Sequence, residues 1–149
     1  MTRWTEVSAF TRTHGEYEIS DDPARFDLDV IERLLRGTYW AWERPRAAME
    51  KSIARSLCLG AYWRGAQVGF GRAVTDGATI AWICDVVIDE AHRGAGLGKM
   101  LVEAVVNHPE IAALRQILAT RDAHGLYERF GYERFGEVFL ARNFRLRPE

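Results

Sequence analysis

A glycine-rich segment in the second half of the chain combines residue types that can bind phosphate. Three of its seven residues are glycines, which allow tight turns and let a ligand approach the backbone without an intervening side chain. Apolar residues recur with helical spacing from Leu97 onward, so a helix is predicted to begin within the segment. The first turn of a helix presents unpaired N–H groups at the positive end of its dipole, which favours an anion. The segment consists of Arg93, Gly94, Ala95, Gly96, Leu97, Gly98 and Lys99.

Two common phosphate-binding motifs do not fit this segment. A Walker A loop needs glycine where Arg93 stands and serine or threonine where Met100 stands. The dinucleotide fingerprint, counted from Gly94, needs its third glycine at the position of Lys99. The spacing that remains is Arg-x-x-Gly-x-Gly, and the simpler alternative is a structural turn between a strand and a helix.

Asp85 is the acidic residue best placed to move a proton. Alternation along its strand predicts that it shares a face with Ala81, Ile83 and Val87, where an unpaired carboxylate would be costly. It is therefore a candidate general base. The alternatives are an ion-paired carboxylate and a group that only orients a cationic substrate.

An aromatic segment between two predicted helices could contact a ligand. It contains Tyr39, Trp40 and Trp42, followed by Glu43. Such a group could form a lid or an aromatic cage around a cation. The alternative is that these rings only fasten one helix onto the core.

The elements that must position these residues follow from periodicity and turn signals. Two helices are predicted first, one between Asp27 as N-cap and Gly37, the other from Pro45 to about Ser56. A short strand could precede them at Glu16–Ile19. The later predictions are strands at Leu57–Trp63, Gln67–Val74 and Thr79–Ile88, a helix from Leu97 to about Asn107, a strand at Gln116–Ala119, a helix capped by Asp122 and ending before Gly131, and strands at Tyr132–Phe135 and Val138–Asn143. This order predicts an α+β fold with a parallel strand–helix–strand crossover between Thr79 and Ala119.

Composition narrows the function classes. The chain has 149 residues, 20 Lys and Arg against 21 Asp and Glu, and a net charge of -1, which argues against a nucleic-acid-binding surface. Two cysteines exclude a disulfide framework, and the histidines lack metal-ligand spacing. No apolar run is long enough to cross a membrane, and no apolar leader opens the chain. We expect one domain over residues 1–149, in the cytoplasm, without metal, membrane or nucleic-acid partners.

Two ordered motifs resemble those of one family. Arg93, Gly96 and Gly98 fit the pyrophosphate loop of the GNAT superfamily of acyl-CoA-dependent N-acetyltransferases. Ala123, Tyr127 and Gly131 fit a second block, Ala-x-x-x-Tyr-x-x-x-Gly, with Tyr132 in place of the usual Phe. The resemblance covers about Ile31 to Phe135. It implies a GNAT-like fold, a central mixed and mostly antiparallel sheet flanked by about four helices, and acetyl-CoA as co-substrate.

The resemblance also implies roles for individual residues. Tyr127 would donate a proton to the leaving thiolate, the alternative being a packing tyrosine. The backbone of Val86, Val87 and Ile88 would pair with the pantetheine arm, and the Arg93–Lys99 amides would hold the pyrophosphate. Thr120 stands where the family often has an asparagine that contacts the cofactor arm.

The acceptor side follows from the same resemblance. Asp85 would lie beside the thioester, and Tyr39, Trp40 and Glu43 would cover an amine-bearing acceptor. The expected reaction is transfer of an acetyl group to a primary amine by direct attack in a ternary complex. The alternative is a non-catalytic acyl-CoA-binding or sensor module on the same fold. The sequence does not decide between a monomer and a homodimer.

Overall fold

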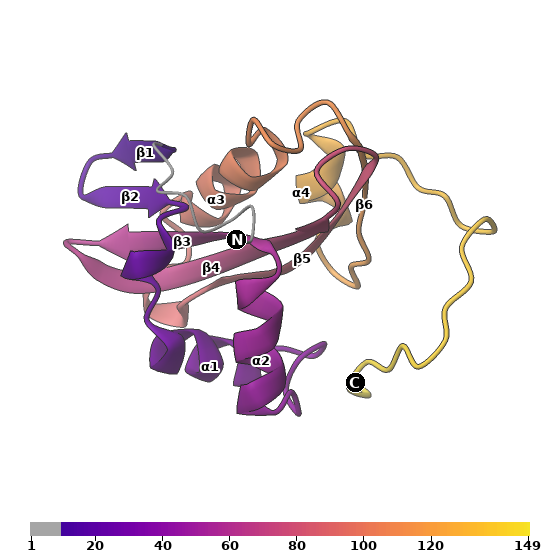
Figure 1. The fold of residues 1–149 in the computed structure, drawn as a ribbon, viewed down its shortest axis with the longest axis horizontal. Helices are drawn as coiled ribbons and strands as arrows, with labels where there is room; N and C mark the ends of the chain where they lie inside the picture. Colours follow the sequence, from indigo (N-terminus) through magenta and orange to yellow (C-terminus); the bar gives the residue numbers. More distant parts are fainter. Residues whose placement is uncertain (1–9) are drawn as a thin grey trace.

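The structure is a computed structural model that describes residues 10–149, and its centre is a curved six-stranded sheet (Figure 1). The strands follow the chain order from one edge of the sheet to the other, and all neighbours are antiparallel except the last pair, β5 and β6, which is parallel. The parallel crossover predicted from the sequence is thereby confirmed. The strands are β1 (Thr11–His14), β2 (Tyr17–Ser20), β3 (Leu57–Trp63), β4 (Ala66–Thr75), β5 (Ile80–Ile88) and β6 (Arg115–Ile117).

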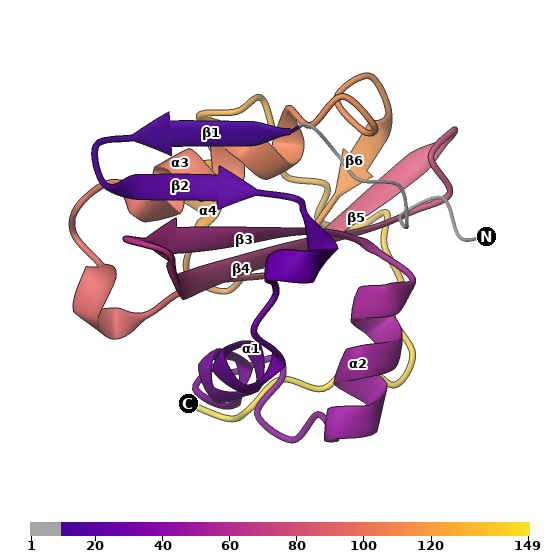
Figure 2. The ribbon, with the colours of Figure 1, turned by 60° about the vertical axis from the view of Figure 1, so that its left-hand side comes forward.

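Helices cover both faces of the sheet. The first two, α1 (Leu28–Arg36) and α2 (Arg46–Ala54), lie on one face, and α3 (Leu97–Val106) lies on the other (Figures 1 and 2). The short helix α4 (His124–Glu128) lies near β6, and 3-10 turns occur at Pro23–Arg25 and Glu90–His92. The expected α+β architecture, a mostly antiparallel mixed sheet with four α-helices, is confirmed for the described residues. Among them, none of the helices has the length and apolar character that a membrane span requires.

Local sequence explains where the first helices begin. The side chain of Asp27 accepts hydrogen bonds from the backbone N–H groups of Asp29 and Val30, at 3.1 and 3.2 Å, so it is the N-cap of α1 as predicted. Pro45 stands at the N-cap of α2, one position before the first helical residue, with extended backbone angles. The loop between these two helices carries the aromatic segment.

The small residues of β4 let α3 approach the sheet closely. A Cβ added at Gly71 would lie 3.0 Å from a methyl group of Val105, a residue of α3. Gly71 and Ala73 therefore form a low surface that receives α3, while Phe70 packs on the opposite face in the cluster with α1. The helix that follows the glycine-rich segment is thus fixed against the sheet.

A β-bulge in β5 changes the face on which Asp85 lies. Phe70 pairs with Val87 and Arg72 with Cys84, so two residues of β5 oppose Gly71 alone. Asp85 takes a left-handed backbone conformation with φ of 55°. The prediction that Asp85 shares a face with Ala81 and Ile83 is therefore wrong, because strict alternation does not pass through a bulge. Those two residues pack toward α3, whereas Asp85 and Val87 lie on the side of α1.

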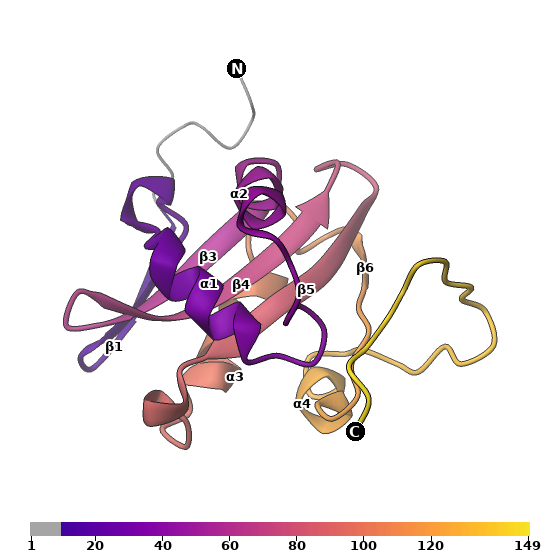
Figure 3. The same ribbon diagram turned by 90° about the horizontal axis from the view of Figure 1, so that it is seen from below.

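The C-terminal part departs from the predicted strands. Residues 132–135 and 138–143 form no strand, and β1, which was not predicted, does form. The apolar residues Val138, Phe139 and Leu140 are exposed, with Leu140 at 100%. A strand needs a hydrogen-bonded partner, and the nearest sheet edge is β6, which has three residues. The segment instead swings away from the sheet and turns back toward it (Figures 1 and 3).

Candidate active site

The glycine-rich segment forms an open turn into α3. Gly94 and Gly96 have φ values of 86° and 80°, and a Cβ at either would meet no atom within 4 Å. Gly96 is the N-cap of α3, no side chain of the described residues caps this end, and its first turn contains no acidic residue. Met100 donates the first helical hydrogen bond to Gly96, so the N–H groups of Leu97, Gly98 and Lys99 point out of the helix without intrahelical partners. The side chain of Leu97 itself is buried in the core.

Positive charge flanks this turn, and contacts behind it hold its shape. Arg93 and Lys99 are exposed, and Nε of Arg93 donates a hydrogen bond of 3.1 Å to the carbonyl of Ile88. The hydroxyl of Tyr17 and Nδ1 of His92 lie 3.0 Å apart, which ties the turn to β2. A helix N-terminus with two adjacent cations and free amides suits a phosphate or pyrophosphate group.

The strand before this turn has an open edge. β6 pairs with β5 only from Ile80 to Trp82, and none of the described residues continues the ladder. The following part of β5, including Val86, Val87 and Ile88, therefore leaves main-chain groups on this side available to an extended ligand. The unpaired part of β5 thus lies directly before the glycine-rich turn into α3.

Asp85 is buried beside this edge within a network of charged groups. Its side chain is 1% exposed, and Oδ2 accepts hydrogen bonds from Arg44 Nη1 at 2.6 Å and Arg72 Nε at 2.8 Å. Oδ1 accepts a hydrogen bond of 3.1 Å from Nε1 of Trp40. Burial opposes ionisation, but the charges and hydrogen bonds of Arg72 and Arg44 outweigh it, so the pKa of Asp85 is lowered. Of the roles considered above, this arrangement favours the ion-paired or orienting carboxylate, and general base catalysis by Asp85 stays a prediction.

Tyr127 projects from α4 into the same region. Burial raises the pKa of its phenol to about 12, with smaller contributions from Tyr39, Cys84 and Asp122. Its ring meets that of Tyr132 with centroids 5.7 Å apart. Tyr127 also packs against the core cluster that includes Leu97 and Leu101 of α3. Its raised pKa means that the phenol keeps its proton at neutral pH.

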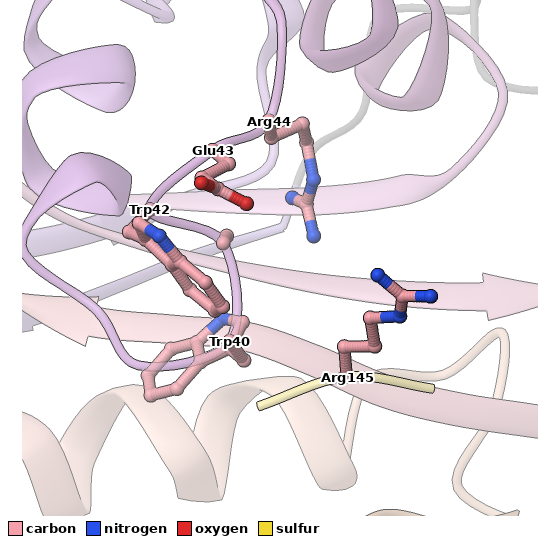
Figure 4. Close-up of a pocket in the computed structure, with 6 residues that line it drawn as sticks. Trp40, Trp42, Glu43, Arg44 and Arg145 are labelled. Atoms are coloured by element: carbon pink, nitrogen blue, oxygen red, sulfur yellow. The ribbon is translucent and has the colours of Figure 1, made fainter. Parts of the chain in front are cut away.

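The aromatic loop covers this region from the side of α1. The hydroxyl of Tyr39 accepts a hydrogen bond of 2.8 Å from the N–H of Arg121, and Trp40 reaches Asp85. Trp40, Glu43 and Arg44 line a pocket of about 250 Å³ (Figure 4). The structure thus brings Tyr39, Trp40 and Asp85 together through direct contacts, and places Glu43 in the wall of the pocket.

Thr120 supports the start of α4. Its hydroxyl oxygen accepts a hydrogen bond of 3.1 Å from the N–H of Ala123, which is the N-cap in place of the predicted Asp122. A contact of Thr120 with a cofactor stays a prediction. Within residues 10–149, no group of three or more His, Cys, Asp and Glu side chains could hold a metal ion.

Comparisons with known proteins assign the family. The family described as Acetyltransferase (GNAT) domain matches residues 54–134, more than half of the chain. The chain belongs to the GNAT family. It is 30% identical over 139 residues to "Putative acetyltransferase FG08082" of Gibberella zeae, an alignment covering 77% of each protein. A solved GNAT structure from Xanthomonas campestris, described as a "putative acetyltransferase", is 38% identical with a TM-score of 0.81, over 87% of this chain and 94% of that chain.

A more distant solved structure supports the fold alone. The ribosomal-protein-S18-alanine N-acetyltransferase of Escherichia coli has a TM-score of 0.66 at 18% identity, over 87% of this chain and 88% of that chain. At this identity the likeness says nothing about the acceptor of this chain, because a fold does not imply a substrate, and the acceptor must be inferred from the site itself.

Three arginines of the site were not singled out from the sequence. Arg72 lies on the same apolar face of the sheet as Phe70. Because a buried charge needs a partner, an arginine at such a position could have predicted a buried carboxylate. Arg44 ends the aromatic segment, and nothing in its position predicts a contact with Asp85. Arg145 lines the pocket from the C-terminal segment. The sequence predicted strands in this segment only as far as Asn143 and indicated no role for Arg145.

Proposed function

We propose that this GNAT protein transfers the acetyl group of acetyl-CoA to a primary amine by direct attack in a ternary complex. The observation that carries the proposal is an open strand edge that leads directly into an uncapped helix N-terminus, together with a protonated tyrosine on α4. These three features are the open edge of β5, the uncapped N-terminus of α3 and the protonated phenol of Tyr127 on α4. They supply, in order, a binding edge, an anion site and a proton donor.

The residues present fit acetyl-CoA. The amides of Leu97, Gly98 and Lys99 and the charges of Arg93 and Lys99 suit the pyrophosphate, and no side chain fills the space at Gly94 and Gly96. The backbone of Val86, Val87 and Ile88 suits the amide groups of the pantetheine arm. Acetyl-CoA supplies the activated acyl group as a thioester, and the protein supplies position and proton transfer.

Two proton transfers accompany the reaction. A primary amine has a pKa of about 10.4 and must lose a proton before its nitrogen can attack the thioester carbonyl. As the C–S bond breaks, the hydroxyl of Tyr127 donates its proton to the sulfur, and the amide is left as product. A phenol with a pKa of about 12 is protonated at neutral pH and is therefore ready to donate.

Asp85 has a positioning role in this proposal. A carboxylate with a lowered pKa that is paired with Arg44 and Arg72 is a weak base, so water carries the proton away from the amine. The contacts of Asp85 with Trp40 and Arg44 instead hold the aromatic loop over the acceptor site.

The experiment measures binding and turnover separately. Calorimetry with acetyl-CoA tests the anion site, and a panel of amines is then screened for release of CoA thiol. Binding with CoA release and formation of an N-acetyl product supports the enzyme. Binding without turnover on any amine favours the alternative, a non-catalytic acyl-CoA-binding module on the same fold, and absence of binding contradicts both.

We also propose that the chain forms a homodimer through its C-terminal segment. Val138, Phe139 and Leu140 are exposed together, and the apolar surface they present would be buried against a second copy. Light scattering at micromolar concentration tests this, with the triple substitution to serine expected to give a monomer. A wild-type monomer would contradict it.

A further inference from the structure

Two arginines face each other across the pocket under the aromatic loop. Trp40, Ala41, Trp42, Glu43 and Arg44 form one side, and Arg145 of the C-terminal segment completes the lining. In Figure 4 the guanidinium groups of Arg44 and Arg145 point toward each other, and the two indole rings lie on the other side of the pocket. The indole rings thus form an aromatic wall, and the two guanidinium groups approach the pocket from opposite segments of the chain.

The positive charge at this pocket exceeds the nearby negative charge. Arg44 and Arg72 share one carboxylate, that of Asp85, whose side chain is 1% exposed and lies behind the pocket. Arg145 forms no hydrogen bond or ion pair with the described residues, and neither does the exposed Glu43. The three guanidinium groups of Arg44, Arg72 and Arg145 therefore outnumber the two carboxylates of Asp85 and Glu43. An anion bound between Arg44 and Arg145 would relieve the repulsion between these two arginines.

The C-terminal segment is fastened on both sides of Arg145. The ring of Phe144 packs on Trp82 of β5 with centroids 6.4 Å apart. The N–H of Arg147 donates a 2.8 Å hydrogen bond to the carbonyl of Tyr39, and the carbonyl of Arg147 accepts one of 2.7 Å from Arg121 Nη2. These contacts fix the backbone of the C-terminal segment on both sides of Arg145, so the fold brings this residue to the aromatic loop.

From this arrangement, we propose that the acceptor is a small amine that also carries a carboxylate or phosphate group, bound between Arg44 and Arg145. The inference rests on the proposed function and names the substrate class of the same site. The pocket of about 250 Å³ has room for a small molecule. Two of its lining residues, Trp40 and Arg44, hydrogen-bond Asp85, the residue before Val86 in β5, so the pocket wall is joined directly to the proposed reacting edge. An anion held there leaves the amine free to reach the thioester.

The experiment compares acceptors that differ only in charge. Linear amines of equal length ending in a carboxylate, a phosphate, an amide or a second amine are assayed for CoA release and N-acetyl product. We expect wild-type kcat/KM to favour an anionic acceptor at least 10-fold over the amide and the diamine. The carboxylate and phosphate arms show which anion the pocket accepts.

Variants then assign the preference to Arg145. Arg145→Gln is expected to lower kcat/KM for the anionic acceptor about 10- to 100-fold, mainly through KM, with little change for the amide, as expected for a charged hydrogen bond. Arg145→Lys should restore part of it. Arg142→Gln, the same change at an exposed position of the same segment outside the pocket, is the control and should match wild type.

Failure of this inference is distinguishable from failure of the proposed function. Acetylation of amines without a preference for the anion, or an equal loss for all acceptors in Arg145→Gln, overturns the substrate class alone. Absence of acetylation with every amine overturns the proposed function, and the substrate class with it.

Discussion

Nε1 of Trp40 donates a hydrogen bond of 3.1 Å to Oδ1 of Asp85, a residue 45 positions further along the chain. The bond joins the aromatic loop after α1 to the bulge of β5. Because the same carboxylate binds Arg44 of this loop and Arg72 of β4, one buried charge joins three segments, the aromatic loop, β4 and β5. The loop and the sheet edge are therefore expected to respond together to changes at Asp85.

Replacing Asp85 by Asn tests this network. The variant keeps the shape but leaves Arg44 and Arg72 without their shared counter-charge, so we expect a loss of about 3–5 kcal/mol in the free energy of unfolding, the usual cost of breaking a buried pair. Turnover should fall while acetyl-CoA affinity stays nearly unchanged. Urea denaturation, steady-state kinetics and calorimetry measure the three quantities.

The control for this variant is Asp29→Asn, which removes an exposed carboxylate paired with Arg46. An exposed ion pair contributes about 1 kcal/mol or less, so this change should leave stability and turnover near wild type. If Asp85→Asn unfolds no more easily than Asp29→Asn, the network does not stabilise the fold.

The pH dependence of stability should show the lowered pKa of Asp85. A group whose pKa is lower in the folded state stabilises the protein above its unfolded pKa, about 3.9, and loses this contribution as pH falls through the folded pKa. The difference in unfolding free energy between wild type and Asp85→Asn should thus be constant from pH 5 to 8 and shrink below about pH 4. An acid limb of kcat near pH 6 that disappears in Asp85→Asn would instead identify Asp85 as the base.

The part of the fold nearest the cofactor site was predictable because its signals are local. The N-cap of α1 follows from Asp27, and the helical spacing after Leu97 marks α3 directly. The C-terminal strands were not predictable, since residues 138–143 have strand-like composition but no partner strand to complete a ladder. Pairing is decided by the sheet edge, which composition does not reveal.

The candidate site was predictable where a motif fixes the backbone and not where side chains meet across the fold. The left-handed Gly94 and Gly96 follow from glycine spacing. The bulge at Asp85 carries no glycine, so its side chain was expected on the wrong face of the sheet. Arg145 lines the pocket because the backbone of Arg147 is hydrogen-bonded to Tyr39, more than a hundred residues earlier in the chain. No local sequence pattern predicts such a contact.

Gly96→Glu should strongly weaken acetyl-CoA binding. The substitution strains a backbone with φ of 80° and puts a carboxylate beside the N–H groups of α3, where it repels the pyrophosphate. Calorimetry should show a loss of at least 10-fold in affinity. Gly77→Glu is the matched control, since Gly77 has φ of 73° and lies before β5, at the end of that strand away from the loop. Unchanged affinity in Gly96→Glu, or an equal loss in both variants, would contradict the placement of the cofactor.

Cys84 should be unreactive, in keeping with direct transfer to the amine. Burial is the main cause that raises the pKa of its thiol to about 12, so almost no thiolate exists at pH 8. Iodoacetamide should label neither Cys84 nor the buried Cys58 in the native protein, and both after unfolding in urea. Mass spectrometry after incubation with acetyl-CoA should find no acetylated cysteine. An acetyl group on Cys84 would show an acyl-enzyme and contradict the ternary complex.

Tyr127→Phe tests the proton donor most directly. The change keeps the ring that packs against Tyr132, so stability should change little, but the leaving thiolate loses its proton source. We expect kcat to fall about 100-fold, the low end for general acid catalysis. The loss should shrink with an acyl donor whose thiol is more acidic, because that thiolate leaves without help. Tyr132→Phe is the control, since it removes the neighbouring phenol, which bonds Gln116, and should lower stability more than turnover. Wild-type turnover in Tyr127→Phe would reduce Tyr127 to a packing residue and leave water as the proton donor.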